Sequence, residues 1–394
     1  MMKQLSIQRN RLVSLVSFLV FCFLIAGCNK KTTRKPEKDF IYIGTFSNRG
    51  SKGIYVFRFD RKTGKLRFVQ ATTHEKSPSF VTITPNKKYL YAGCRGGIPP
   101  NKKWGSVVAY RINQKSGKLS YLNVRPAYGP GSCFVDTSPN GKMVFVANYV
   151  GGDLAAYKIE NNGMLSQVTD TIIHQGHGVN PARQAHPHVH STVPSPNGKY
   201  VYASDLGTDK IYTYKVDYQN GSLTPGKPPF IKTKPGDGPR HLVFTNSSKY
   251  AYSVHEMGSS VTAYRYDAQN GSLHFIKRYS TLPKYYQGKN KAAEIHLGPK
   301  DKFLYVSNRG DNSLAIFKIN KNDGKLTRID IQKTHGDFPR NFIVDPLGNY
   351  VIVANRHSDN LVVFKRNQKT GLLTYTGEQV KVPVPVCVKW IRLP

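Results

Sequence analysis

The chain has 394 residues and a formal net charge of +35, from 58 lysines and arginines against 23 aspartates and glutamates. Such a basic surface can attract nucleic acid, anionic lipid or acidic polysaccharide. The lysines are spread over the whole chain, however, and no module of aromatic and basic residues for stacking bases is present, so we predict a solvated basic shell and no nucleic-acid partner. Cys94, Cys133 and Cys387 lack Cys-x-x-Cys spacing, which predicts buried thiols rather than a zinc site or a redox pair.

Residues 1–27 have the pattern of a lipoprotein signal peptide. Basic residues at Lys3, Arg9 and Arg11 precede an apolar run from Leu12 to Ala26. The run is followed by Gly27 and Cys28, and Leu-Ile-Ala-Gly-Cys resembles a bacterial lipobox, whose cysteine is lipidated after cleavage in front of it. An ordinary secretory signal or an N-terminal membrane anchor are the alternatives, but the apolar run is short for a spanning helix.

Residues 28–39 are predicted to be the lipidated cysteine and a flexible basic tether. Asn29 is not the aspartate that resemblance to lipoproteins of the inner membrane would require. We therefore expect a cell-envelope lipoprotein that is anchored in the membrane through Cys28, at the periplasmic face of the outer membrane.

From residue 40 onward the chain repeats one unit seven times. A Gly-x-Leu turn recurs every 46 to 58 residues, with its glycine at Gly64, Gly117, Gly163, Gly221, Gly271, Gly324 and Gly371. Between these turns come a strand, a turn like Pro-Asn-Gly-Lys, an aromatic-rich strand, a short loop and a third strand. A period near 50 residues with about four short strands is typical of a β-propeller blade. We predict an all-β, seven-bladed propeller over residues 40–394, as a monomer.

The two ends of the repeat are predicted to share one blade. Residues 40–45 match the second strand of a unit, whereas residues 385–391 match a first strand with no partner after it. Pairing these two segments closes the ring and leaves no room for a second domain.

Alignment of the seven units shows where the repeat stops being regular. Six residues before the turn proline, in the strand that lines the channel of a propeller, the units carry Ser79, Cys133, His190, Arg240, Ala293 and Arg340. A scaffold position would repeat one residue type. This position varies and brings one histidine and two arginines to one mouth of the channel.

A second variable position follows the second strand of each unit. It holds Arg95, Tyr149, Leu206, Glu256, Arg309 and Arg356, after a position with Cys94, Asn148, Asp205, His255, Asn308 and Asn355. Adjacent antiparallel strands reverse direction, so both positions open on the same mouth. One carboxylate, Glu256, among several guanidiniums indicates an anion-binding site with one candidate base.

Each of these residues also has a plain structural explanation. Glu256 can simply pair with a neighbouring arginine, and Asp205 can cap its own turn. His188 and His190 can satisfy backbone groups. His186, His188 and His190 alternate as a metal-binding strand does, but no carboxylate is fixed nearby in sequence, so we predict no metal and no cofactor.

The chain resembles the lactonase family of seven-bladed propellers, which includes bacterial 6-phosphogluconolactonases and fungal carboxymuconate-lactonizing enzymes. The likeness covers residues 40–394, and the stretches that carry it most clearly are 238–244, 252–261, 293–296 and 306–309. Asp205-Leu-Gly and residues 338–341 add support. The resemblance implies roles for His190, Arg240, Glu256 and Arg309.

Two features depart from the usual family pattern. His255 replaces the asparagine that usually precedes the glutamate. A lipoprotein signal would also export the chain away from cytosolic 6-phosphogluconolactone.

The resemblance and the two variable positions together imply hydrolysis of a small anionic lactone of a sugar acid. Glu256, His190 and Arg240 are the predicted catalytic residues. The predicted substrate-binding residues are Arg309, Arg340, Arg356, His188 and His255. The alternative is an envelope-anchored propeller without catalysis that binds an anionic ligand or scaffolds other proteins, because a fold does not fix a function.

Overall fold

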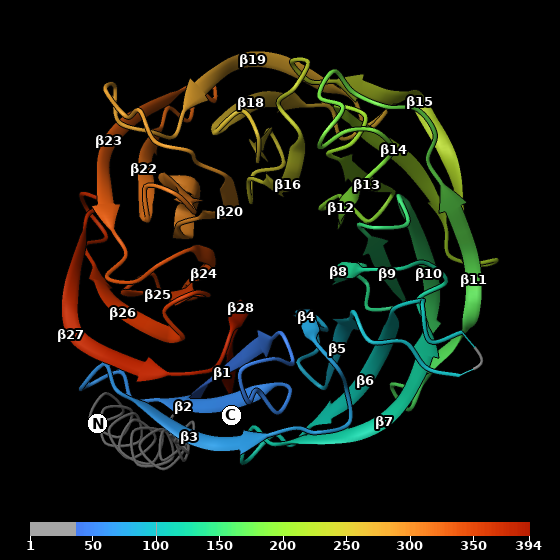
Figure 1. Ribbon diagram of the computed structural model, residues 1–394, viewed down its shortest axis with the longest axis horizontal. Coiled ribbons are helices and arrows are strands. Elements are labelled where there is room, and N and C mark those ends of the chain that lie inside the picture. Colours follow the sequence, from blue (N-terminus) through green and yellow to red (C-terminus); the bar gives the residue numbers. More distant parts are fainter. Residues whose placement is uncertain (1–36, 100) are drawn as a thin grey trace, which may run out of the picture. The chain divides into compact units, whose positions relative to one another are not determined.

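The computed structural model describes residues 37–99 and 101–394, and in this part of the chain 28 strands form seven four-stranded antiparallel sheets around a central channel (Figure 1). The one helical segment described is the short 3-10 turn Pro299–Asp301. The predicted all-β, seven-bladed propeller is confirmed. The predicted signal peptide, Cys28 and the tether up to residue 36 lie outside the described residues.

The first strand of each blade is the innermost one and the fourth is the outermost (Figure 1). From the channel outward, the blades consist of β28 (Pro385–Leu393), β1 (Lys38–Thr45), β2 (Tyr55–Phe59) and β3 (Leu66–Ala71); β4 (Pro78–Ile83), β5 (Tyr89–Cys94), β6 (Ser106–Ile112) and β7 (Leu119–Pro126); β8 (Ser132–Thr137), β9 (Met143–Asn148), β10 (Asp153–Ile159) and β11 (Leu165–Ile173); β12 (Val189–Pro194), β13 (Tyr200–Asp205), β14 (Lys210–Asp217) and β15 (Ser222–Lys232); β16 (Pro239–Phe244), β17 (Tyr250–His255), β18 (Ser260–Tyr266) and β19 (Leu273–Ser280); β20 (Ala292–Leu297), β21 (Phe303–Asn308), β22 (Ser313–Ile319) and β23 (Leu326–Lys333); and β24 (Pro339–Val344), β25 (Tyr350–Asn355), β26 (Asn360–Arg366) and β27 (Leu373–Lys381).

The ring is closed by pairing between the two ends of the repeat, as the sequence predicts. Strand β28 pairs with β1 along its length, with Phe40 opposite Ile391. The buried carboxylate of Asp39 strengthens this junction, because it accepts hydrogen bonds from Trp390 Nε1 at 2.7 Å and from Arg61 Nε at 2.6 Å. The first and last segments of the repeat are therefore held together by a strand ladder and by the hydrogen bond from Trp390 to the buried Asp39.

A tyrosine on the second strand explains why the Gly-x-Leu turns recur. The Tyr42 hydroxyl donates to the carbonyl of Gly117 in the next blade at 2.8 Å, and Tyr91 donates to Gly163 at 2.9 Å. The same contact joins Tyr202 to Gly271, Tyr252 to Gly324 and Tyr305 to Gly371. All seven turn glycines have φ between 69° and 87°, a region that disfavours side chains. The repeat thus encodes contacts between neighbouring blades.

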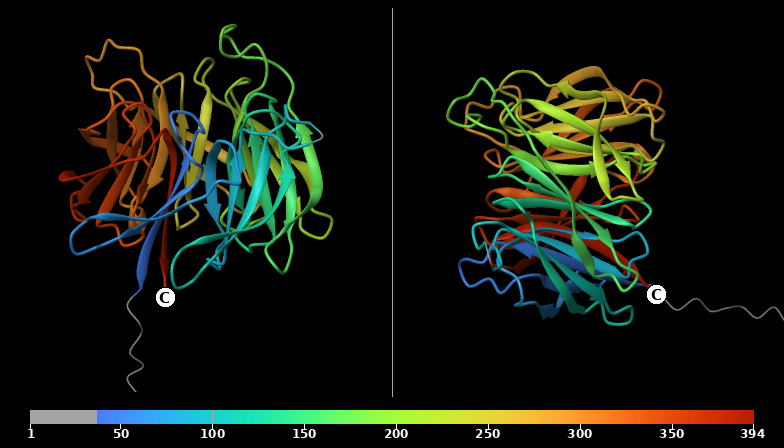
Figure 2. Two further views of the ribbon diagram at one scale, coloured as in Figure 1. Left: turned by 60° about the horizontal axis from the view of Figure 1, so that its bottom comes forward. Right: turned by 90° about the vertical axis from the view of Figure 1, so that its right-hand side faces the viewer.

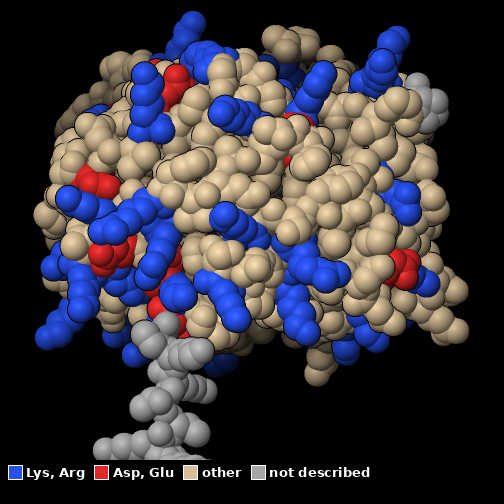
Figure 3. All heavy atoms as spheres, turned by 90° about the horizontal axis from the view of Figure 1, so that it is seen from below, with Lys and Arg blue, Asp and Glu red and all other residues tan. Residues whose placement is uncertain are grey.

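The surface of the propeller is strongly basic, as the composition predicts. Lysine and arginine side chains are spread over the face seen in Figure 3 and outnumber the acidic side chains there. Within residues 37–99 and 101–394, no helix has the length and apolar character needed to cross a membrane.

Candidate functional site

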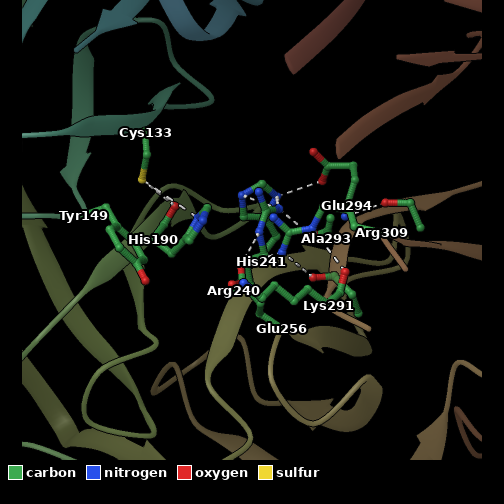
Figure 4. A network of polar contacts seen from close by, with 12 residues as sticks. Cys133, Tyr149, His190, Arg240, His241, Glu256, Lys291, Ala293, Glu294 and Arg309 are labelled. Carbon is green, nitrogen blue, oxygen red and sulfur yellow. Dashed lines mark hydrogen bonds and ion pairs between the residues drawn. The ribbon is translucent and has the colours of Figure 1, made fainter. Parts of the chain in front are cut away.

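The variable position on the inner strands coincides with a β-bulge in every blade, and in the seventh blade the skipped residue is Val386. The ladder between the first and second strands skips Ser79, Cys133, His190, Arg240 and Arg340, and it skips both Ala293 and Glu294 in β20. A bulge re-aims the side chain of the extra residue. Arg240 and its neighbour His241 accordingly both enter the polar network of the channel (Figure 4). The bulges explain why this position carries unusual residues.

Glu256, at the end of β17, is the centre of this network. Its Oε2 lies 2.7 Å from Arg309 Nη2 and 3.3 Å from Arg240 Nε, and its Oε1 lies 2.8 Å from Arg183 Nη2. Burial alone would raise the pKa of Glu256, but Arg309, Arg240 and Arg183 outweigh burial and hold this pKa well below its usual range. The carboxylate therefore stays ionised and accepts protons poorly.

Backbone carbonyls fix two of these arginines in place. Arg240 is fully buried, and its Nη1 donates to the carbonyl of Ala293 at 2.5 Å. Arg309 donates from Nε to Lys291 at 3.1 Å and from Nη2 to Ala292 at 3.0 Å. Burial, together with the charge of Arg309, lowers the pKa of Arg240 to about 10, which leaves it charged at neutral pH. Two guanidiniums are thus oriented before any ligand arrives.

His190 lies beside this cluster as a neutral imidazole. Its ring packs edge-on against Tyr149 and His241, with centroids 5.3 Å and 5.2 Å away, and Nδ1 lies 3.9 Å from the Cys133 thiol (Figure 4). Burial, followed by the charge of Arg240, lowers the pKa of His190 well below 6.5. Burial also raises the pKa of the Cys133 thiol to about 11. Cys94, Cys133 and Cys387 are all free and buried, as predicted.

Three further arginines surround the ring of Phe46. The guanidinium carbons of Arg95, Arg356 and Arg340 lie 4.8, 4.9 and 5.6 Å from the centroid. Within the described part of the chain, none of the three has an acidic partner, although only 8% of the surface of Arg340 is exposed. Burial, with Arg240, Arg309 and Arg95, lowers the pKa of Arg340 well below its usual value. The surplus positive charge favours an anionic ligand.

We call Arg240, Arg309, Arg340 and Arg356, with Glu256 and His190, the arginine cluster. The structure brings together all six of these predicted site residues at the mouth where the inner strands begin.

The other two predicted binding residues have different surroundings. His188 stacks on Tyr149 at 4.4 Å, and its Nδ1 lies 2.8 Å from the Tyr149 carbonyl oxygen, at the edge of the arginine cluster. His255 is fully buried, and its Nε2 lies 2.8 Å from Thr262 Oγ1 on the neighbouring strand. Its side-chain hydrogen bond thus lies within its own blade, so a role in substrate binding stays a prediction.

The alternating histidines do not share one centre. His186 packs against His188, whereas His190 faces Cys133 and His241. No three His, Cys, Asp or Glu side chains of residues 37–99 and 101–394 are grouped as metal ligands. Asp205 caps its own turn, as weighed from the sequence, because its Oδ1 accepts the amide of Gly207 at 2.9 Å.

Two features of the site escaped the sequence analysis. Arg183 lies in the loop of residues 174–188, and its Nη2 also lies 3.3 Å from the Tyr149 hydroxyl. The signal for this insertion was the longest interval between turn glycines, from Gly163 to Gly221. The second feature is a chain of contacts from His241 through Glu294 to Asn341, each one residue after the variable position of its inner strand.

Comparisons with known proteins identify the family of the chain. The sequence matches the family model described as "Lactonase, 7-bladed beta-propeller" over residues 40–390. It is 35% identical to the 6-phosphogluconolactonase of Bacillus subtilis over 352 residues, which span 89% of this chain and 98% of the relative. It is also 34% identical over 314 residues to a 6-phosphogluconolactonase of Formosa agariphila, which covers 79% of this chain and 87% of the relative.

Two solved structures share both fold and sequence with the chain. One is a putative 6-phosphogluconolactonase from Bacteroides fragilis, with 35% identity, a TM-score of 0.83, and coverage of 90% of this chain and 98% of that one. The other is the periplasmic gluconolactonase of Pseudomonas aeruginosa, with 31% identity, a TM-score of 0.85, and coverage of 91% and 100%.

Proposed function

Because the chain belongs to the lactonase family of seven-bladed β-propellers, we propose that it hydrolyses the ring ester of an anionic sugar-acid lactone at the arginine cluster. The observation that carries this proposal is one buried carboxylate, Glu256, among more guanidiniums than it can neutralise. The names of the relatives, 6-phosphogluconolactonase and gluconolactonase, supply the substrate class.

Arg340 and Arg356 are the proposed binding groups for the anionic substituent of the lactone. Both guanidiniums pack on Phe46, and neither has an acidic partner in the described part of the chain. A phosphate or carboxylate would provide the missing counter-charge, and the planar arginine fork binds either group in a bidentate manner. The substrate would then lie with its ring ester toward Arg240 and His190.

His190 is the better placed of the two candidate bases. It is neutral at neutral pH, and its Nε2 has no hydrogen bond to any described residue. Glu256, in contrast, is held ionised by three arginines. In the proposed mechanism, His190 removes a proton from a water molecule that attacks the lactone carbonyl carbon, while Glu256 keeps Arg240 and Arg309 in place.

Arg240 is the proposed stabiliser of the tetrahedral intermediate. Its buried guanidinium is anchored at the Ala293 carbonyl and carries positive charge where the oxyanion would form. Such a preorganised donor contributes about 3–4 kcal/mol to the stabilisation of a transition state. When the ester bond of the ring breaks, the protonated His190 returns its proton to the leaving alkoxide, so this mechanism needs no metal and no cofactor.

Turnover of defined lactones tests the proposal directly. The purified protein would be assayed with 6-phosphogluconolactone and with the unphosphorylated gluconolactone, beside His190→Asn and Glu256→Gln. We expect faster hydrolysis of the phosphorylated lactone, a larger loss of kcat in His190→Asn than in Glu256→Gln, and little change in KM in either variant. A folded wild-type protein with no turnover above spontaneous hydrolysis would favour a binding platform instead. The reverse order of the two variants would make Glu256 the base.

We also propose that Cys28 carries a lipid anchor that holds the propeller at the periplasmic face of the outer membrane. The lipobox-like sequence supports this, and a relative from Pseudomonas aeruginosa is described as periplasmic. Labelled palmitate should be incorporated into the wild type but not into Cys28→Ser.

A further inference from the structure

A layer of buried side chains lies in the channel directly next to the arginine cluster. One position after the bulges, Phe80 and Phe134 stack at 4.3 Å, and His241 packs edge-on against Phe134 at 5.0 Å. His241 Nδ1 lies 2.8 Å from Glu294 Oε1, and Asn341 donates to the other oxygen of Glu294. All five side chains are buried, so we call them the central plug.

Beyond the central plug lies a cavity of about 620 Å³ at the other mouth of the channel. Phe80, Phe134, His241 and Glu294 form its floor, and the turns at Pro139, Pro196, Pro299 and Pro346 form its rim. No residue of the arginine cluster lines this cavity. The inner strands start at the arginine cluster and end at these turns, so the two sites lie on opposite sides of the plug.

Three polar side chains in the cavity wall have charge or hydrogen-bonding capacity that contacts within the protein do not fully use. The Lys389 ammonium lies 4.8 Å from the centre of the Phe80 ring and has no acidic partner in the described part of the chain. Asp136 uses only Oδ1, which accepts from Thr82 Oγ1 and from the Thr137 amide at 2.9 Å each. His296 lines the same cavity and packs edge-on against Phe342.

The protonation of these groups defines what they can bind. Burial raises the pKa of Asp136, and the positive charge of Lys389 opposes that rise. Burial lowers the pKa of His296 to about 4, so its imidazole is neutral at neutral pH. The carboxylates of Asp136 and Asp345, which line the cavity with Lys300 and Lys389, disfavour a dianion such as phosphate, because like charges repel. A neutral imidazole and a free carboxylate oxygen instead suit hydroxyl groups.

We propose that this cavity is a second ligand site, for a small hydroxy-carboxylate of the sugar-acid type. Lys389 binds the carboxylate, Asp136 and His296 hydrogen-bond to hydroxyl groups, and the aromatic floor packs against the carbon chain. His241 belongs to the floor and also lies 3.2 Å from Arg240 Nη1, so an occupied cavity contacts the layer that supports the arginine cluster. Binding at this site does not depend on the proposed lactonase activity.

Calorimetric titration of the purified protein with D-gluconate tests the second site. Gluconate is also an expected product at the arginine cluster, so Lys389→Met and Arg340→Met are compared to separate the two locations. We expect Lys389→Met to lose one binding event or to weaken it by tenfold or more, with unchanged lactone turnover. Arg340→Met should retain that event. The neutral polyol sorbitol should not bind.

The outcomes separate the second site from its alternatives. Asp136→Asn has the same size and can keep the contact to Thr82, so it covers the case in which Lys389→Met fails to fold; a threefold or greater loss is expected. Gluconate binding that is unaffected by both cavity variants, or that disappears entirely in Arg340→Met, would refute the proposal. Binding of alanine but not of gluconate would also refute it, since the site would then recognise a zwitterion. If lactone turnover is absent, these binding results keep the same meaning.

Discussion

The two mouths of the channel differ, although the same seven inner strands form both. At the mouth where these strands begin, all seven strands are bulged and several arginines surround one carboxylate. At the mouth where they end, the strands run regularly into short turns, and the cavity there is lined by Lys300 and Lys389 together with Asp136, Glu294 and Asp345. The blades tolerate variation at the arginine cluster because the contacts that join neighbouring blades, between tyrosines and turn glycines, do not involve these residues.

Loop length separates the two mouths as well. Most connections into the inner strands have three to six residues, but residues 174–188 precede β12 and residues 281–291 precede β20. These two long loops rise from the same face of the ring (Figure 2). Both reach the arginine cluster, because Arg183 contacts Glu256 and the Lys291 carbonyl accepts from Arg309. The two loops that depart most from the repeat therefore both lie around Glu256 and its partner Arg309.

Replacement of Arg240 by methionine should have the largest effect on activity. The variant loses the buried charge that faces the developing oxyanion, and it leaves Glu256 with one ion pair fewer. We expect kcat to fall by about 100- to 1000-fold, with a much smaller change in KM. Steady-state kinetics with the preferred lactone would measure both values.

Lys389→Met is the matched control for this substitution at the opposite mouth. It also removes one positive charge from an inner strand, but Lys389 lines only the second cavity. Its turnover should equal that of the wild type. Equal losses in the two variants would mean that net charge in the channel, rather than the position of Arg240, determines the rate.

The sequence contains most of the fold because the fold is a repeat. The turn glycines, the strand that follows each Pro-Asn-Gly-like turn and the unmatched strand at residues 385–391 predict seven blades and their closure, and the structure confirms both. Alignment of the units also places His190, Arg240 and Glu256 at one mouth. That step works because a repeat makes departures visible at equivalent positions.

Other parts of the site could not be obtained in this way. Arg183 lies in an insertion with no equivalent in other blades, so no alignment of units assigns its position. The weak basicity of Glu256 depends on arginines from three separate segments of the chain, which only the folded geometry brings together. The imidazole of His255 contacts Thr262 inside its blade, whereas the adjacent Glu256 contacts Arg309. The sequence alone does not show that these two neighbours point to different places.

His255→Asn tests whether this histidine takes part in substrate binding at the arginine cluster or only packs inside its own blade. Burial lowers the pKa of His255 to about 4 in the folded protein, whereas an unfolded histidine titrates near 6.5. As the pH falls from 6.5 to 4, the unfolded chain binds the proton first, so folding stability decreases. Between pH 7 and pH 5 this histidine should lower the free energy of unfolding by about 2 kcal/mol, and the variant should lack that contribution.

Urea unfolding at the two pH values would measure this contribution. His274→Asn, which changes an exposed histidine of the same blade, is the control and should behave as the wild type does. Turnover of His255→Asn should stay close to that of the wild type. A large loss of activity with unchanged pH dependence of stability would place His255 in the substrate site.

Arg183→Met should have the smallest of these effects. Its ion pair with Glu256 spans 2.8 Å, but 30% of the Arg183 side chain is exposed, so water screens part of the interaction. Glu256 keeps Arg240 and Arg309 as partners in the variant. We expect kcat/KM to fall by about three- to tenfold, the range of a partly screened charge pair. Arg265→Met, at an exposed position on β18 of the Glu256 blade, should leave kcat/KM unchanged. If the two variants behave alike, the long loop that carries Arg183 does not contribute to turnover, and the difference between the two mouths rests on the bulged strands alone.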